Sequence, residues 1–66
     1  MDQRLFIYRA LIYNKRTNTY TVARTLRDRQ FSNKNDVMND YNNWIVDLIR
    51  KLHEDETIIN ENLIGL

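Results

Sequence analysis

An apolar repeat with helical spacing is the feature that most constrains what this chain can fold into. Between residues 37 and 52, apolar side chains recur at intervals of three, four and one residues, which places them on one face of an α-helix. The members of the repeat are Val37, Tyr41, Trp44, Ile45, Leu48, Ile49 and Leu52. The pattern predicts a long amphipathic helix, with Tyr41 and Trp44 packed in the core rather than stacked on a nucleic-acid base.

We expect this helix to cover about residues 34–55. Asn33 can cap the free N–H groups of the first turn, and Asp36 stands where the acidic partner of a capping box belongs. Acidic residues 54–56 weaken the last turn, because they lie at the negative end of the helix dipole. The solvent face of the helix is predicted to be mainly acidic and to carry Asp36, Asp40, Asn43, Asp47, Arg50 and Glu54.

Two segments rich in aromatic and β-branched residues precede the helix and predict an antiparallel β-hairpin over about residues 4–29. The five residues 14–18 suit the connecting loop. With a loop of this length, Tyr13 is expected opposite Thr19, and side-chain alternation then assigns each residue to a face. The face toward the helix is predicted to carry Phe6, Tyr8, Ala10, Ile12, Tyr20, Val22, Arg24 and Leu26.

The opposite face of the predicted hairpin has an apolar flank on its first strand. This face carries Leu5, Ile7, Arg9, Leu11 and Tyr13, beside Thr19, Thr21, Ala23, Thr25 and Arg27 of the second strand. An exposed apolar patch of this kind usually marks an interface. We therefore expect the C-terminal tail, a second subunit or a partner to cover Leu5, Ile7, Leu11 and Tyr13.

The tail, residues 57–66, is too apolar to remain in solvent, since it holds Ile58, Ile59, Leu63, Ile64 and Leu66. It is expected to pack as a third strand or as a short helical turn. The prediction is one α+β domain over residues 1–66, with a hairpin or three-stranded sheet packed on the long helix. A core of this size only just offsets the conformational entropy of folding, and the chain has no Cys and one His, so disulfides and a structural zinc are excluded as supports.

The net charge of +1 conceals a separation along the chain. Residues 1–34 hold eight basic and two acidic side chains, whereas residues 35–66 hold two basic and seven acidic ones. The basic side chains of the hairpin are candidates for phosphate or guanine contacts in DNA, because Arg donates two parallel hydrogen bonds to either group. These candidates are Arg9, Lys15, Arg16, Arg24, Arg27 and Arg29. The alternative is that they protect an edge strand from aggregation or pair with the acidic helix of the same molecule.

The sequence argues against an enzyme. The single Ser and the single His, Ser32 and His53, lie at opposite ends of a predicted helix about 30 Å long, so they cannot form a nucleophile and base pair within one subunit. The acidic residues that follow His53 point in different directions on a helix and do not converge on a metal. With Gly65 as the one glycine, no phosphate-binding loop is present. We expect no catalytic residue, no metal and no cofactor.

The order of hairpin, charged turn, Thr-rich basic strand and capped helix resembles the arm-type DNA-binding domain at the N-terminus of phage and transposon tyrosine integrases. Phe31, Asn33, Asp36 and Val37 stand where that family has a Phe, a helix cap, an acid and a small apolar residue. The resemblance covers about residues 5–50 and implies a sheet laid in the DNA major groove with the helix packed behind it. The chain departs from the family in three ways: its turn lacks glycine, Asn replaces Thr at the cap, and two strands precede the helix.

The first functional hypothesis is a small DNA-binding protein, encoded by a phage or mobile element, that uses the basic hairpin. The second is a phage-type protein that binds and modulates or inhibits a host protein through the apolar flank or the acidic helix. A homodimer that buries the first strand against itself is a third. Frequent Asn and Ile fit the AT-rich genomes of phages, and the lack of a signal peptide, membrane span or Cys leads us to expect a cytoplasmic location in a bacterial host.

Overall fold

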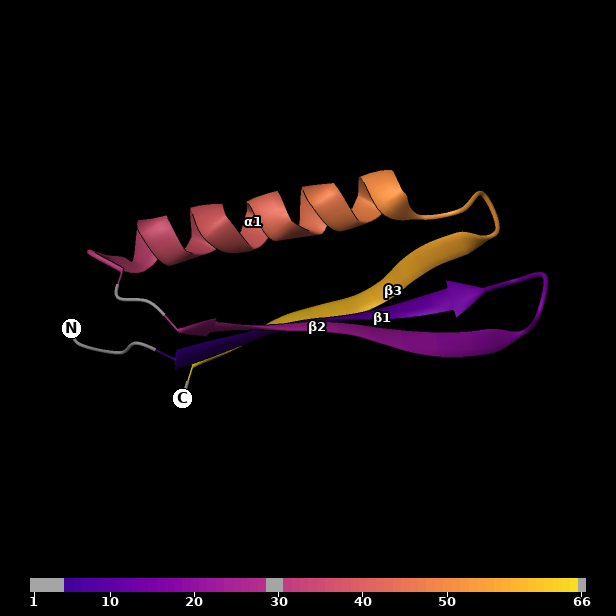
Figure 1. The fold of residues 1–66 in the computed structure, drawn as a ribbon, viewed down its shortest axis with the longest axis horizontal. Helices are drawn as coiled ribbons and strands as arrows, with labels where there is room; N and C mark the ends of the chain where they lie inside the picture. Colours follow the sequence, from indigo (N-terminus) through magenta and orange to yellow (C-terminus); the bar gives the residue numbers. More distant parts are fainter. Residues whose placement is uncertain (1–4, 29–30, 66) are drawn as a thin grey trace.

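The computed structural model describes residues 5–28 and 31–65. Its elements, in chain order, are β1 (Leu5–Asn14), β2 (Thr19–Asp28), α1 (Lys34–Lys51) and β3 (Glu56–Gly65). The three strands form one antiparallel sheet in the order β2-β1-β3, and α1 lies along one face of it (Figure 1). The predicted α+β class is confirmed, and the tail forms a third strand rather than a helical turn.

β1 occupies the centre of the sheet, with β2 on one side and β3 on the other. This place suits its sequence, because a central strand with a covered face has the greatest need of apolar side chains. Tyr8, Ala10 and Ile12 of β1 are buried beneath α1. The core is therefore built on the first strand of the chain.

α1 begins where its cap was predicted and ends earlier than expected. Asn33 Oδ1 accepts a hydrogen bond of 3.0 Å from the Asp36 N–H. The last helical residue is Lys51, and Leu52 has extended backbone angles, so the predicted extension to residue 55 is wrong. The chain turns instead, with the Glu56 N–H donating to the His53 carbonyl at 2.9 Å. β3 then starts at Glu56. Acidic residues 54–56 therefore follow α1 instead of forming its last turn, where they would lie at the negative end of the helix dipole.

The core lies between α1 and the sheet, and its helical side consists of Val37, Tyr41 and Ile45. Tyr41 packs edge-on against Tyr8, with the ring centroids 5.2 Å apart. Trp44 is partly buried, and its ring centroid is 5.9 Å from that of Tyr8. The predicted packing of Tyr41 and Trp44 in the core is confirmed.

The register of the hairpin differs by one residue from the predicted register. Asn14 lies opposite Thr19, so the loop has four residues, 15–18, rather than five. The loop is closed by Asn14 Oδ1, which accepts from the backbone N–H groups of Arg16 and Thr17 at 2.9 and 3.1 Å. Asn18 has a φ of 56°, a left-handed conformation that Asn tolerates better than most residues.

A shift of one residue turns every side chain of β2 to the other face of the sheet. The predicted face assignment of β2 is therefore wrong throughout, while that of β1 is right. Thr21, Ala23, Thr25 and Arg27 face α1, and Tyr20, Val22, Arg24 and Leu26 face away from it. α1 is the one helix in the part of the chain that the structure describes, and it does not combine the length and the apolar character needed to cross a membrane.

Candidate functional site

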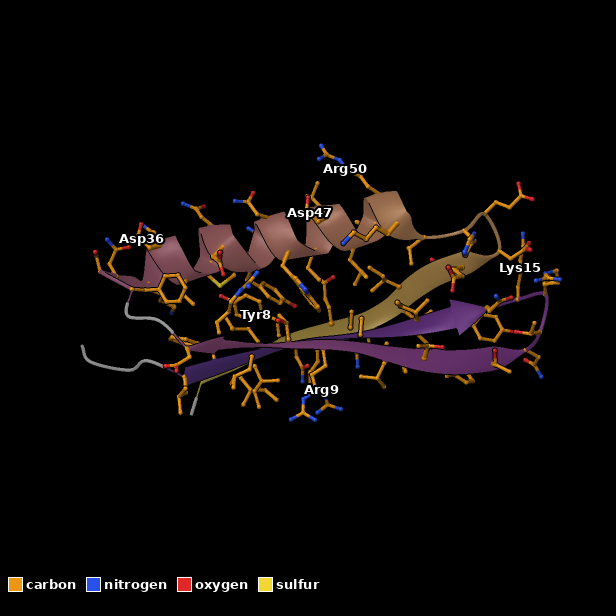
Figure 2. All side chains as sticks on the ribbon, viewed as in Figure 1. Tyr8, Arg9, Lys15, Asp36, Asp47 and Arg50 are labelled. Carbon is orange, nitrogen blue, oxygen red and sulfur yellow. The ribbon has the colours of Figure 1, made fainter. Side chains whose placement is uncertain are left out.

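The outer face of the sheet, defined as the face opposite α1, is left uncovered by the described part of the fold. Arg9 projects from this face, on the side of the sheet away from Tyr8 and α1 (Figure 2). Strand alternation and register place on the same face Leu5, Ile7, Leu11 and Tyr13 of β1, Tyr20, Val22, Arg24, Leu26 and Asp28 of β2, and Asn60, Asn62 and Ile64 of β3. Among the described residues, no helix or strand packs over it.

The apolar side chains of the outer face are well exposed. Tyr20 retains 62% of its accessible surface, Leu26 57% and Val22 51%. The register shift adds these residues of β2 to the predicted apolar flank of β1. The predicted flank consists of Leu5, Ile7, Leu11 and Tyr13. In the described part of the chain, β2 and β3 lie beside it in the same sheet, and neither packs over its side chains. The apolar patch is thus wider than the sequence indicated, and patches of this kind mark binding sites.

Arg9 and Arg24 form the polar centre of this face. They lie directly opposite one another on β1 and β2, and both are exposed. Like charges in this arrangement destabilise a sheet slightly, and within residues 5–28 and 31–65 neither arginine forms an ion pair. A shallow pocket of about 280 Å³ lies beside them and is lined by Ile7, Arg9, Val22, Arg24 and Ile64.

Arg27, predicted on the outer face, lies on the inner face instead. Its Nε donates to Asp40 Oδ2 of α1 at 3.0 Å, and its guanidinium carbon is 5.5 Å from the centroid of the Tyr8 ring. The predicted position of Arg27 on the outer face is therefore wrong, as is the predicted position of Arg24 on the core face. The cause is the one-residue register shift, which exchanges the two arginines between faces.

The remaining predicted cations lie away from the Arg9 and Arg24 pair. Lys15 and Arg16 occupy the hairpin tip, where Lys15 is exposed (Figure 2). Arg16 Nε is 3.3 Å from Asp55 Oδ2, and Arg29 falls outside the described residues. The five candidate cations that the structure describes are thus divided among the outer face, the inner face and the tip.

Tyr8, Arg27 and Asp40 form a polar cluster. Its Arg27–Asp40 pair matches the alternative that basic hairpin residues pair with the acidic helix, whereas the part played by Tyr8 was not predicted. The Tyr8 hydroxyl donates to Asp40 Oδ2 at 2.8 Å. Burial, reinforced by the hydrogen bond and the negative charge of Asp40, raises the pKa of Tyr8 to about 12. The cluster joins β1, β2 and α1. Its one sequence signal is that Asp40 follows Val37 by three residues and precedes Trp44 by four, which places it at the margin of the apolar stripe.

Two tyrosines stand at the end of the outer face nearest the loop. The rings of Tyr13 and Tyr20 are 5.0 Å apart between centroids, and the Tyr13 hydroxyl donates to Asn18 Oδ1 at 2.8 Å. Tyr13 is thereby fixed by the loop, whereas Tyr20 remains exposed and able to contact a partner.

Of the four acidic side chains predicted on the solvent face of α1, two lie there; Glu54 falls in the turn after α1 ends, and Asp40 is the other exception. Asp36 and Asp47 point away from the sheet (Figure 2), and the carboxylate of Asp47 is 3.8 Å from the guanidinium of Arg50. Asp40 points inward to the cluster described above. Within the described part of the chain, no group of three or more His, Asp or Glu side chains could hold a metal ion.

Comparison with known proteins found no matching protein family, no matching curated protein and no matching solved structure. The class that the fold and the outer face define is an α+β protein with one sheet face covered by its own helix and the other face open.

Proposed function

We propose that this chain is a small, non-enzymatic binding protein that docks a partner protein on the outer face of its sheet. The partner presents an apolar surface with a carboxylate that pairs with Arg9 and Arg24. The observation that carries the proposal is this pair of exposed arginines, opposite one another within an exposed apolar face. Apolar burial supplies the free energy of binding, and the arginines select the partner.

The apolar residues of the outer face are available for binding because the fold does not use them. Complete burial of a Leu or Val side chain is worth about 1.5–3 kcal/mol relative to full exposure. Val22 and Leu26 keep just over half of their surface exposed, so each can still gain about half of that amount on a partner.

The arginine pair favours a different protein over a second copy of this chain. In a two-fold dimer centred on this face, the same patch of each subunit meets its equivalent. Four guanidinium groups from Arg9 and Arg24 would then be brought together and desolvated, at a high cost. A partner carboxylate instead accepts two parallel hydrogen bonds from a guanidinium. We therefore favour a different protein over a second copy of this chain as the partner that binds this face.

DNA binding is the second candidate function, and the outward direction of Arg9 and Arg24 is the observation that favours it. Both side chains could donate to phosphates or to guanine, with Lys15 at the hairpin tip as a third contact. Two other candidates, Arg16 and Arg27, are held by carboxylates of the same chain, which shortens the basic strip. For either function, we propose a phage or mobile-element protein that acts in the cytoplasm of a bacterial host.

Capture of a partner from a nuclease-treated bacterial lysate tests the protein-docking proposal when two variants are compared. Val22→Lys/Leu26→Lys and Asp47→Lys change the net charge equally, but the first alters the outer face and the second the solvent face of α1. We expect one stoichiometric protein to be recovered with the wild type and with Asp47→Lys, and to be lost with the double variant. Recovery with the double variant would contradict the proposal, and loss with Asp47→Lys alone would assign binding to the acidic helix.

Fluorescence anisotropy of a labelled DNA duplex at low and high salt tests the second candidate. If the chain docks a protein, we expect no DNA binding at physiological salt. Binding that weakens steeply with salt, with a slope reduced by about two in Arg9→Ala/Arg24→Ala, would favour DNA instead.

A further inference from the structure

We propose that the partner covers the outer face with an amphipathic helix, whose apolar stripe is interrupted midway by one acidic residue that pairs with Arg9 and Arg24. The complex is then a sandwich of three layers, helix on sheet on helix. This inference rests on the proposed docking function and adds the secondary structure and side-chain pattern of the partner.

The inner face of the same sheet already shows how it accepts a helix. α1 packs on it through Val37, Tyr41 and Ile45, and a single carboxylate at the margin of that stripe, that of Asp40, meets Arg27. Apolar contacts thus hold the layers together, and the Arg27–Asp40 ion pair helps to fix the helix on the sheet. The outer face offers the same combination of apolar side chains and arginine, but among the described residues no carboxylate pairs with Arg9 or Arg24.

The spacing of side chains on the outer face matches the rise of a helix laid along the strands. The cross-strand pair of Ile7 and Leu26 precedes the arginine pair by two positions of β1. The pair of Leu11 and Val22 follows it by two. Two residues of a strand span about 6.6 Å, and four residues of a helix rise about 6 Å. Apolar residues at helix positions i and i+8, with an acid at i+4, would therefore face the three pairs in order.

A helix fits this face better than a single extended segment does. A lone strand laid flat on side chains would leave its own N–H and C=O groups without partners, whereas a helix satisfies them internally. The pocket of about 280 Å³ beside Arg9 and Arg24 provides room for the acidic side chain. Ile7, Val22 and Ile64 line the same pocket, so they exclude water around the ion pair and strengthen it.

Selection from a displayed library of helical peptides tests the inference. One face of each peptide is randomised over eleven or more positions, and the library is selected on the full chain and, separately, on Arg9→Glu/Arg24→Glu. With the wild type, we expect enrichment of peptides that carry an acid flanked by apolar residues three or four positions to each side. With the charge-reversed variant, we expect Lys or Arg to replace that acid.

Binding of one enriched peptide should weaken at least tenfold with Arg9→Glu/Arg24→Glu and remain within twofold with Arg50→Glu, which reverses an exposed charge on α1. Far-UV circular dichroism checks that each variant is folded. No enrichment, enrichment without the acid, or the same acid selected by both proteins would overturn the inference. Even if the helix inference is overturned, the docking proposal still holds when Val22→Lys/Leu26→Lys abolishes capture of the partner from a lysate. The docking proposal is contradicted when that variant still captures the partner.

Discussion

Tyr8 shows how far this small core depends on a single polar contact. Its side chain is fully buried, yet its hydroxyl reaches the carboxylate of Asp40, so the polar atom is not left without a partner. The same carboxylate accepts from Arg27. Asp40 thus links α1 to both β1 and β2 through charge-assisted hydrogen bonds.

Replacement of Asp40 is expected to destabilise the fold more than replacement of any acid on the solvent face of α1. Asp40→Ala leaves the Tyr8 hydroxyl and the Arg27 guanidinium without their acceptor, and we expect the free energy of unfolding to fall by about 2 kcal/mol. Asp47→Ala, the matched control, should change it by less than about 0.5 kcal/mol. Urea denaturation followed by Trp44 fluorescence measures both, and equal effects would show that the cluster contributes nothing.

The raised pKa of Tyr8 predicts a loss of stability in alkali. The pKa is about 12 in the folded chain against 10.0 for an ordinary Tyr, so the folded state binds the phenolic proton more tightly than the unfolded state does. The corresponding stability is fully present below pH 10 and is lost as the pH rises from 10 to 12. Urea denaturation at pH 9 and pH 11.5 should show a smaller decline for Tyr8→Phe than for the wild type. A decline that is the same in both proteins would assign it to other groups.

At the scale of the elements, α1 is set by local signals that a sequence displays. Asn33 caps its first turn through the Asp36 N–H, and this contact involves residues three apart in the chain. Asn33→Ala should lower the free energy of unfolding by about 1 kcal/mol, and Asn35→Ala, at an exposed position inside the helix, should not. Thermal unfolding monitored by circular dichroism compares the two, and a similar melting temperature for both would contradict the role of the cap.

The same contrast between local and distant contacts explains which features could be predicted from the sequence. The stripe of α1 and its cap depend on spacing, and most of both was predicted. The errors were the C-terminal end of the helix, the inward position of Asp40 and the exposure of Ile49. The hairpin register depends on how Asn14 and Asn18 close the loop, and residue types alone do not distinguish four loop residues from five. That single difference moved Arg24 to the outer face and Arg27 to the inner one, so two of the six candidate cations were assigned to the wrong face.

At the scale of the whole molecule, the two faces of the sheet have different roles, and stability measurements can separate them. Ile45 is buried in the core, and Ile45→Ala is expected to cost about 2–4 kcal/mol, a large part of the stability of so small a domain. Val22→Lys/Leu26→Lys on the outer face should cost less than about 1 kcal/mol. Urea denaturation gives both values. A large loss with the double variant would mean that the outer face supports the fold itself rather than a partner.

Because β1 lies between β2 and β3, its two edges become paired at different times while the chain is being synthesised. The hairpin of β1 and β2 can close in about 1–10 μs, but the roughly 40 residues between the end of β1 and the start of β3 take about 2–8 s to synthesise at 5–20 residues per second. For those seconds one edge of the most apolar strand is open to any other strand in the cell. Arg9 lies on that strand, and charged side chains on an open edge hinder unwanted pairing. Arg9, which is proposed to select a partner in the folded protein, would thus first hinder unwanted strand pairing in the incomplete chain.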